Sequence, residues 1–267
     1  MRRRAAAEPG APASPTEVDS LQRGLEILRA FRTGEKSLRL ADILARTKMP
    51  RLMAQKLLNT LTAHHFLRYL PEFDRYEPDV SCFVLGHSLR ASTPVLRVAR
   101  PVMQELADKL GVDVILAMRE GMAMMILESC GARANSAESA PGTLVPLART
   151  AVGRTWLWAQ RPAIQGGFIE RIRAEADANT LDAIPGIYRA FQDLAERGYC
   201  LSLGDWLHDR QAVATPLIPT GGREVYALAA MATDHRSRET FLRDTVAPAL
   251  LDAAQRIKSE LPRTENQ

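Results

Sequence analysis

The sequence predicts an α+β protein in which a winged helix-turn-helix precedes a larger domain built on an antiparallel sheet flanked by helices. Two observations support this prediction. The first ninety residues contain short helical patterns around a tight turn, followed by two β-like runs. The remaining residues contain strands mostly in hairpin order, with helical patterns before, between and after them. At 267 residues, the chain has the length of one large domain or two ordinary ones.

Two helices and a tight turn open the first part of the chain. Leu21, Leu25 and Leu28 recur at i, i+4 and i+7, and Ile27 and Phe31 widen this face. The pattern predicts an amphipathic first helix at Val18–Arg32. A second helix is expected at Leu40–Thr47. It ends before Pro50, because a proline disfavours helical geometry at the residue that precedes it.

The third helix, Arg51–His64, follows this turn, and a helix in that place is a standard way to reach base edges in the major groove of DNA. Its inward stripe consists of Ala54, Leu57, Leu58 and Leu61. On the outward face, Gln55 and Asn59 suit adenine, and Lys56 suits guanine or phosphate. Arg51, at the helix start, suits a phosphate contact. The alternative, that these polar side chains only solvate a surface helix, stays open.

Two β-like runs, Phe66–Leu70 and Tyr76–Val80, follow the third helix and are joined by a turn that is typical of a wing. A moderately apolar helix is expected at Ser81–Ser92. The front of the chain therefore divides into a disordered Ala/Pro-rich tail at residues 1–15, a winged helix-turn-helix at residues 16–80 and a linker helix at residues 81–94.

Positive charge is concentrated at the front of the chain. Residues 1–100 hold 17 Lys and Arg against 10 Asp and Glu, whereas residues 101–267 hold 18 against 21. A nucleic-acid contact confined to the front fits this asymmetry, although a solvated basic surface with an arginine-rich tail gives the same count. The sequence has no recognisable signal peptide or membrane-spanning run, so we expect a cytoplasmic protein without membrane contact.

The rear part, residues 95–262, is expected to alternate between helices and strands. Helices are predicted at Leu96–Leu110, from Thr150 or Ala151 onward, at Leu181–Arg197 and at Arg238–Leu261. Strands are predicted at Val112–Met118, Met122–Glu128, Leu144–Leu147, Tyr199–Leu203, Gln211–Leu217 and Glu224–Ala232. The pair Gly166-Gly167 is expected to break a helix rather than to cradle a phosphate.

Short stretches along the chain match a known family. In the front part they are Val18-Asp19-Ser20-Leu21, Gly24-Leu25-Glu26-Ile27-Leu28, Leu57-Leu58-Asn59-Thr60-Leu61 and Leu85-Gly86. In the rear part they are Pro146-Leu147, Ala151-Val152-Gly153-Arg154, Arg197-Gly198-Tyr199 and Ala212-Val213-Ala214-Thr215-Pro216. In this order and spacing they resemble the isocitrate-lyase-regulator (IclR) family of bacterial transcription factors. The resemblance implies a winged helix-turn-helix, a linker helix that helps dimerisation and a GAF-like effector-binding domain.

The resemblance also implies three partners: double-stranded operator DNA, a small-molecule effector, and further copies of the chain in a homodimer or homotetramer. Family members usually carry a pair of small hydroxyl residues where the recognition helix begins, and this chain instead has Leu52-Met53. Because an apolar pair can contact thymine methyl groups, we include Leu52 and Met53 among the DNA-binding residues.

The family's effector contacts carry over to Ala151, Val152, Ser202, Ala212, Ala230 and Ala232. The first-turn amides of the helix near Ala151 are free to bind a carboxylate. Because only Ser202 keeps a polar side chain, we expect a small, mostly apolar acid, either aromatic or short-chain. Met118 is added as an apolar lining residue. Packing against a helix is the alternative for Ala230 and Ala232, and ordinary core is the alternative for Met118.

No enzyme activity, cofactor or metal is expected. The five histidines are dispersed, no serine lies in a nucleophile elbow, and the three cysteines match no metal-ligand spacing. Two alternatives to a ligand-sensing regulator stay open. One is a GAF-like thiol redox enzyme that uses Cys130 or Cys200, and the other is an oligomeric DNA-binding protein that senses no ligand.

Overall fold

The computed structural model describes residues 18–32, 34–134, 136–174, 183–220, 224–232 and 239–261. It separates into two compact units, residues 1–92 and residues 93–267. The predicted tail at residues 1–15 and the predicted start of the final helix at Arg238 lie outside the described residues. No helix in the described ranges is long and apolar enough to cross a membrane.

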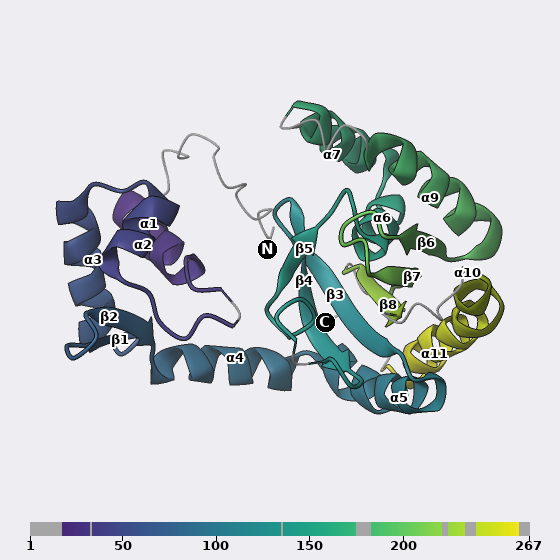
Figure 1. Ribbon diagram of the computed structural model, residues 1–267, viewed down its shortest axis with the longest axis horizontal. Helices are drawn as coiled ribbons and strands as arrows, with labels where there is room; N and C mark the ends of the chain where they lie inside the picture. The colour runs from purple at the N-terminus through teal and green to yellow at the C-terminus, as the bar shows by residue number, and fades with distance from the viewer. Residues whose placement is uncertain are drawn as a thin grey trace. The chain divides into compact units, whose positions relative to one another are not determined.

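The first unit is a helix-turn-helix followed by a two-stranded wing and one further helix (Figure 1). Its elements are α1 (Asp19–Arg29), α2 (Leu40–Thr47), α3 (Arg51–Ala63), β1 (Leu67–Leu70), β2 (Arg75–Pro78) and α4 (Val80–Ser92). In the turn before α3, Lys48 has a φ of 56°, and Pro50 forms the N-cap of α3 with a φ of −60°. The proline ring fixes φ near this value, so Pro50 is already suited to lead into a helix.

The covered face of α1 is only part of the predicted apolar face. Ile27 is fully buried in the core that α1 forms with α2 and α3, and Gly24 is buried beside it. Leu21 and Leu25 instead remain 62% and 47% exposed. The spacing rule finds the apolar side of a helix, but it does not say which part of that side the neighbouring helices cover.

The wing is a short antiparallel ribbon whose turn comprises residues 71–74. Both predicted strands are present, but the second ends at Pro78, because Val80 begins α4 instead of ending the strand. The backbones of Leu38 and Tyr76 exchange two hydrogen bonds, of 2.9 and 2.8 Å. These bonds tie the wing to the segment before α2, so the wing and the helix-turn-helix form one unit.

Within the described residues, the second unit is a six-stranded antiparallel sheet with helices on both faces (Figure 1). The strand order is β5-β4-β3-β8-β7-β6. The strands are β3 (Asp113–Glu120), β4 (Ala123–Cys130), β5 (Leu144–Pro146), β6 (Cys200–Leu203), β7 (Gln211–Leu217) and β8 (Tyr226–Ala232). The helices are α5 (Pro94–Leu110), α6 (Ala151–Trp158), α7 (Pro162–Ala174), α9 (Ala183–Arg197), α10 (Glu239–Phe241), the π-helical turn η1 (Leu242–Val246) and α11 (Ala247–Glu260). The predicted α+β class is confirmed.

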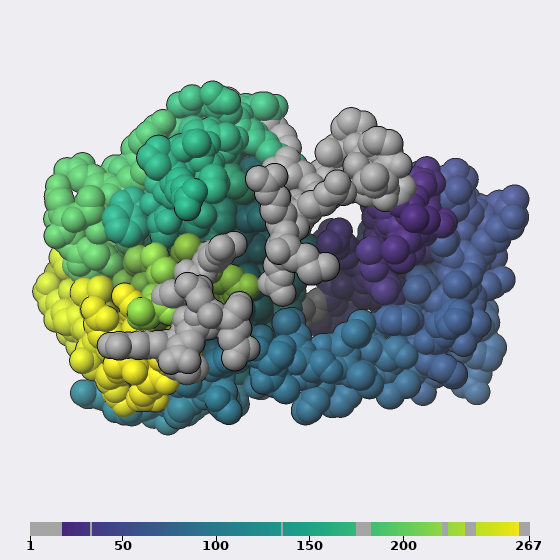
Figure 2. All heavy atoms as spheres, turned by 180° about the vertical axis from the view of Figure 1, so that it is seen from behind, coloured from purple at the N-terminus to yellow at the C-terminus, as the bar shows by residue number. Residues whose placement is uncertain are grey.

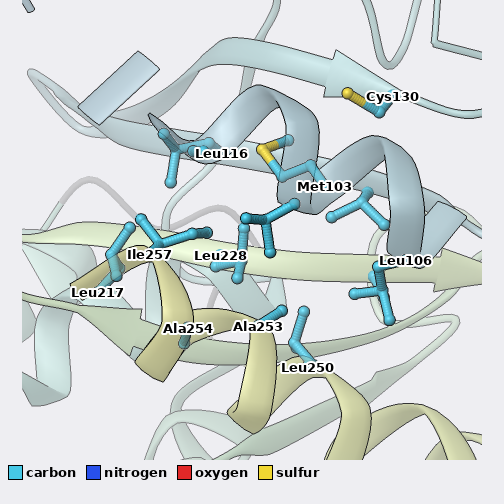
Figure 3. Close-up of a cluster of buried hydrophobic side chains, with 14 of the residues drawn as sticks. Met103, Leu106, Leu116, Cys130, Leu217, Leu228, Leu250, Ala253, Ala254 and Ile257 are labelled. Carbon is cyan, nitrogen blue, oxygen red and sulfur yellow. The ribbon is translucent and has the colours of Figure 1, made fainter. Parts of the chain in front are cut away.

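Two apolar cores lie on opposite faces of the sheet. On one face, Met103 of α5, Leu228 of β8 and Leu250 of α11 pack together (Figure 3). On the other face, Leu157 of α6 and Ile187 of α9 are fully buried in the second core. Figure 2 shows the two helical layers, α11 in yellow and α7 in blue-green, on opposite sides of this unit.

Strand β8 contributes to both cores in alternation. Leu228, Ala230 and Ala232 belong to the core beneath α5 and α11, whereas Ala227 and Ala229 belong to the core beneath α6 and α9. Successive residues of a strand point to opposite faces of its sheet. The small side chains of β8 therefore allow the helices to pack closely on both faces of the sheet. A shift of one residue along the strand changes the core into which an alanine side chain packs.

Helix α7 continues through Gly166-Gly167, so the expectation that this pair breaks a helix is wrong. A Cβ atom at either position would meet nothing within 4 Å, so neither glycine is required for a close approach. Ile169 and Ile172 of the same helix are buried in the core shared with α6 and α9. Tertiary packing of this kind outweighs the cost of glycine in a helix interior, which is about 1 kcal/mol per residue relative to alanine.

Candidate functional site

The recognition helix α3 and the wing border an open cleft in the first unit. Its empty volume, with the solvent at its mouth included, is about 1330 Å³. The polar residues of its lining are Arg39, Arg51, Gln55, Asn59, Thr62, Tyr69, Asp74 and Tyr76. Three residues of the predicted DNA-binding set, Arg51, Gln55 and Asn59, thus lie along one cleft. Sequence reasoning missed Arg39, which precedes α2 and is far from α3 in the chain.

The predicted DNA-binding side chains differ in their freedom to move. Four are exposed, namely Arg51, Leu52, Lys56 and Asn59. The other two, Met53 and Gln55, are half-buried. The Gln55 amide donates a hydrogen bond at 3.2 Å to the hydroxyl of Tyr76, a buried residue of the wing strand β2. Gln55 is therefore held in one orientation by the wing, whereas no such contact restrains Lys56 among the described residues.

A second cavity lies in the second unit, on the face of the sheet that α6 covers. Its empty volume, including the solvent at its mouth, is about 500 Å³. The apolar lining consists of Ile115, Ile126, Val145, Ala151, Val152, Leu207, Ala212, Ala229 and Met231. Glu138, Thr150, Ser202, Trp206 and Arg210 supply polar atoms to the same lining. A mostly apolar cavity with a few convergent polar groups is the usual form of a small-molecule site.

The first turn of α6 forms one wall of this cavity. Thr150 is the N-cap: its hydroxyl accepts a hydrogen bond from the Gly153 amide at 3.2 Å and donates one to the Pro146 carbonyl at 2.7 Å. The amides of Ala151 and Val152, also in the first turn, have no carbonyl one turn earlier in the helix to bond. A helix N-terminus of this kind favours an anion.

Four of the seven predicted effector-binding residues line the cavity, namely Ala151, Val152, Ser202 and Ala212. The other three, Met118, Ala230 and Ala232, do not. Ala230 and Ala232 are buried in the core beneath α5 and α11, and Met118 packs against that core. The pleat of β8 is the reason, because the cavity lies on the opposite face and is lined by Ala229 and Met231 instead.

Arg210 is the positively charged cavity residue that sequence reasoning missed. Its side chain is 10% exposed. One terminal nitrogen donates to the Ser139 hydroxyl and the other to Glu138 Oε2, each at 3.2 Å. Its Nε is buried and has no hydrogen-bond partner among the described residues. The only available signal in the sequence was an arginine directly before a strand, which does not say what lies around it.

A hydrogen-bonded chain connects the cavity to the interior of the unit. The Ser202 hydroxyl donates to Asp205 Oδ2 at 3.2 Å, and the same oxygen accepts from Arg154 Nη1 at 2.6 Å. Arg154 is 3% exposed, and its Nε donates to the Ala148 carbonyl at 3.0 Å. Gly186 of α9 leaves the space for this guanidinium, since a Cβ there would lie 2.6 Å from Arg154 Nη2. Asp205 therefore orients Ser202 and balances the buried charge of Arg154.

The cysteines lack the features of a reactive thiol. Burial raises the pKa of the Cys200 thiol to about 11, and burial also raises the pKa values of Cys130 and Cys82. A reactive cysteine instead needs a lowered pKa, because the thiolate is the nucleophile. Among the described residues, no group of three or more His, Cys, Asp and Glu is placed to hold a metal ion.

Comparisons with known proteins agree with the division of the chain into two units. Residues 20–71 match the model of the IclR helix-turn-helix domain, and residues 87–259 match that of the bacterial transcriptional regulator IclR C-terminal domain. The HTH-type transcriptional regulator TsaQ1/TsaQ2 of Comamonas testosteroni is 27% identical over 247 residues, which are 91% of this chain and 88% of that protein. The Pca regulon regulatory protein of Pseudomonas putida is 25% identical over 251 residues, which are 92% and 85% of the two chains.

Solved structures show the same fold. The IclR family transcriptional regulator of Brucella abortus has a TM-score of 0.84 and 30% identity, covering 96% of this chain and 97% of that one. An IclR homologue of Microbacterium hydrocarbonoxydans, solved in complex with 4-hydroxybenzoate, has a TM-score of 0.72 and 18% identity, covering 90% and 98%. The helix-turn-helix, the effector-type second domain and these matches lead to one conclusion: the chain belongs to the IclR family of bacterial transcriptional regulators and is a DNA-binding regulator.

Proposed function

We propose that this regulator binds a two-fold-related operator as a dimer or tetramer, and that a small, mostly apolar carboxylate in the second unit changes its affinity for that operator. The cavity beside α6 is the observation that supports the sensing role. There the first-turn amides, the Ser202 hydroxyl and the Arg210 guanidinium border a space with apolar walls. The 4-hydroxybenzoate bound by the Microbacterium hydrocarbonoxydans homologue is a ligand of this chemical class.

The test is a titration of a fluorescent operator duplex, selected from random sequences, with the purified full-length protein. Benzoate and 4-hydroxybenzoate are the probes, and neutral benzamide is the control. We expect one of the acids to change the operator Kd by about fivefold or more, the lower range of allosteric coupling, and we expect benzamide to leave it unchanged. If the operator Kd is the same with and without each of the two acids, the result would count against sensing of an aromatic carboxylate.

Two residues of α3 are proposed to act on DNA in different ways. Lys56 is exposed and unrestrained, which suits a phosphate contact, whereas Gln55 is oriented by Tyr76 for a base. Lys56→Ala is expected to weaken binding to selected and random duplexes alike and to reduce the slope of log K against log salt by about 1. Gln55→Ala is expected to relax the preference at one base position by about 1–3 kcal/mol. An unchanged salt slope in Lys56→Ala would contradict the phosphate contact.

Exposed apolar side chains in the first unit support the proposed oligomer. Val80, Phe83, Val84, Leu85 and Leu89 of α4 are each 56–72% exposed, and no residue of α4 is buried. They lie on more than one side of the helix, because Phe83 and Val84 are separated from Leu89 by about 120° and about 140° around the helix axis at about 100° per residue. An apolar helix of this kind is normally covered, and a second copy of the chain is the proposed cover.

Phe83→Glu is expected to shift the protein toward monomer and to weaken operator binding, because the substitution places a charge in the proposed interface. The side chain is 72% exposed in one chain, so the fold of that chain should not change. Sedimentation measurements give the mass, with Phe73→Glu as the matched control, since Phe73 is a 62% exposed aromatic residue in the wing turn. A dimeric mass for Phe83→Glu at micromolar concentration would exclude α4 as the interface.

A further inference from the structure

Arg210 joins two loops at the edge of the cavity beside α6. It ends the connection between β6 and β7, where its backbone carbonyl accepts a hydrogen bond from the Gly204 amide at 2.9 Å. Its guanidinium reaches across to the turn at residues 136–140, where it donates to Ser139 and Glu138. Ser139 is fully buried, whereas the Glu138 side chain is 45% exposed. Arg210 therefore links a fixed hydroxyl to a carboxylate that solvent can reach.

The hydrogen-bonding capacity of Arg210 is not filled. A guanidinium has five N–H donors, and the buried Nε has no partner among the described residues. Leaving such a donor unpaired away from water is costly. Because Arg210 lines the cavity, an anion there can take the unused donor, and a carboxylate with two oxygens suits the planar fork of an arginine.

Glu138 already offers such a carboxylate at the same place. Hydrogen bonds from its own backbone amide and from the Ser136 side chain, with a smaller contribution from the charge of Arg210, hold the pKa of Glu138 below its ordinary value, so this side chain is an anion at neutral pH. Its oxygen lies 3.2 Å from Arg210, which is long for a charge-assisted hydrogen bond. The Glu138 side chain is 45% exposed, so water can solvate its carboxylate when that group leaves Arg210. A ligand can therefore displace Glu138 at small cost.

We propose that Glu138 is an internal competitor for the effector: the ligand carboxylate takes its place on Arg210, and the 136–140 turn is thereby released from the β6–β7 connection. The inference rests on the proposed sensing function and identifies the Arg210 guanidinium as the group that binds the ligand carboxylate. Arg210 is the one cationic side chain in the cavity lining within the described residues, and the remaining walls are mostly apolar. The site is consequently suited to an acid whose remaining part is mostly apolar.

The experiment measures binding of benzoate and of neutral benzamide to the full-length protein by calorimetry. Glu138→Gln keeps the size of the side chain and removes its charge, so we expect benzoate to bind this variant roughly fivefold more tightly than the original protein. Benzamide should show no such gain. Glu105→Gln is the matched control, because Glu105 forms an exposed pair with Arg256 elsewhere in the same unit. Arg210→Gln should lower the affinity for benzoate at least tenfold.

A second readout follows the turn itself. Amide exchange over residues 136–140 should rise when benzoate binds the original protein, and it should already be high in Glu138→Gln without a ligand. The inference is overturned if Glu138→Gln binds benzoate no more tightly, if a folded Arg210→Gln binds it equally well, or if no form binds it. In the first two outcomes the effect of benzoate on operator affinity still supports the proposed function. In the third, sensing of this class of acid fails as well, while DNA binding stands.

Discussion

Replacing Gly153 by alanine is expected to lower the free energy of unfolding of the second unit by about 3 kcal/mol or more, the upper range for overpacking. A Cβ at this position would lie 2.1 Å from the carbonyl oxygen of Leu147 and 2.5 Å from its Cα. Both atoms belong to the backbone, so no side chain can rotate away. Either α6 or the segment after β5 must move.

The consequence for function follows from the place of Gly153 in α6. Its amide donates to the Thr150 hydroxyl, the cap of the helix whose first turn borders the cavity. A shift of α6 would therefore move the amides of Ala151 and Val152, and we expect Gly153→Ala to lose the response to any carboxylate that the original protein senses. Binding of the operator at low temperature should persist, since the substitution lies outside the first unit.

Tryptophan fluorescence during denaturant unfolding is the suitable measurement. All three tryptophans of the chain, Trp156, Trp158 and Trp206, lie in the second unit, so the signal follows that unit alone. Gly166→Ala is the matched control. A Cβ there meets nothing within 4 Å, and the position is inside a helix, so this variant should gain roughly 0.5–1 kcal/mol. Equal stability of the two alanine variants would show that the Leu147 backbone moves away from the added Cβ at little cost in free energy.

Asp205→Ala is expected to destabilise the second unit by about 3 kcal/mol, because it leaves a buried guanidinium without its carboxylate. The Arg154 side chain is 4% exposed, and its ion pair with Asp205 measures 2.6 Å. The same substitution removes the acceptor of the Ser202 hydroxyl. We therefore expect weaker binding of carboxylates in the cavity even under conditions in which the variant stays folded.

Two further variants separate charge from shape at this position. Asp205→Asn keeps the size of the side chain and one oxygen acceptor, so its loss of stability should lie between those of Asp205→Ala and the original protein. Glu105→Ala removes the partner of Arg256 in a pair whose side chains are 59% and 44% exposed. An exposed pair of this kind contributes little to stability. If Asp205→Ala cost no more than Glu105→Ala, the charge of Arg154 would have to be balanced elsewhere.

The helices and strands followed closely from the sequence because they depend on local patterns. Leu40–Thr47 and Gln211–Leu217 have the same bounds in the sequence prediction and in the structure. Short-range repeats of 3.6 and 2 residues, together with Pro50 and Gly111 at helix ends, are sufficient for that. Gly166-Gly167 was one exception, since the burial of Ile169 and Ile172 keeps α7 intact and no local pattern reports that packing.

By itself the sequence determined the fold class, the family and four of the seven expected cavity residues, because each depends on the order of residues along the chain. Only the tertiary structure decided which face of β8 meets the cavity, so that Ala229 replaces Ala230. It also decided that Arg210 lies beside Glu138, 72 positions away in the chain. Strand pleating assigns faces in steps of one residue, and contacts between distant segments depend on how sheets and loops close. Local periodicity contains neither piece of information, and the chemistry of the cavity depends on both.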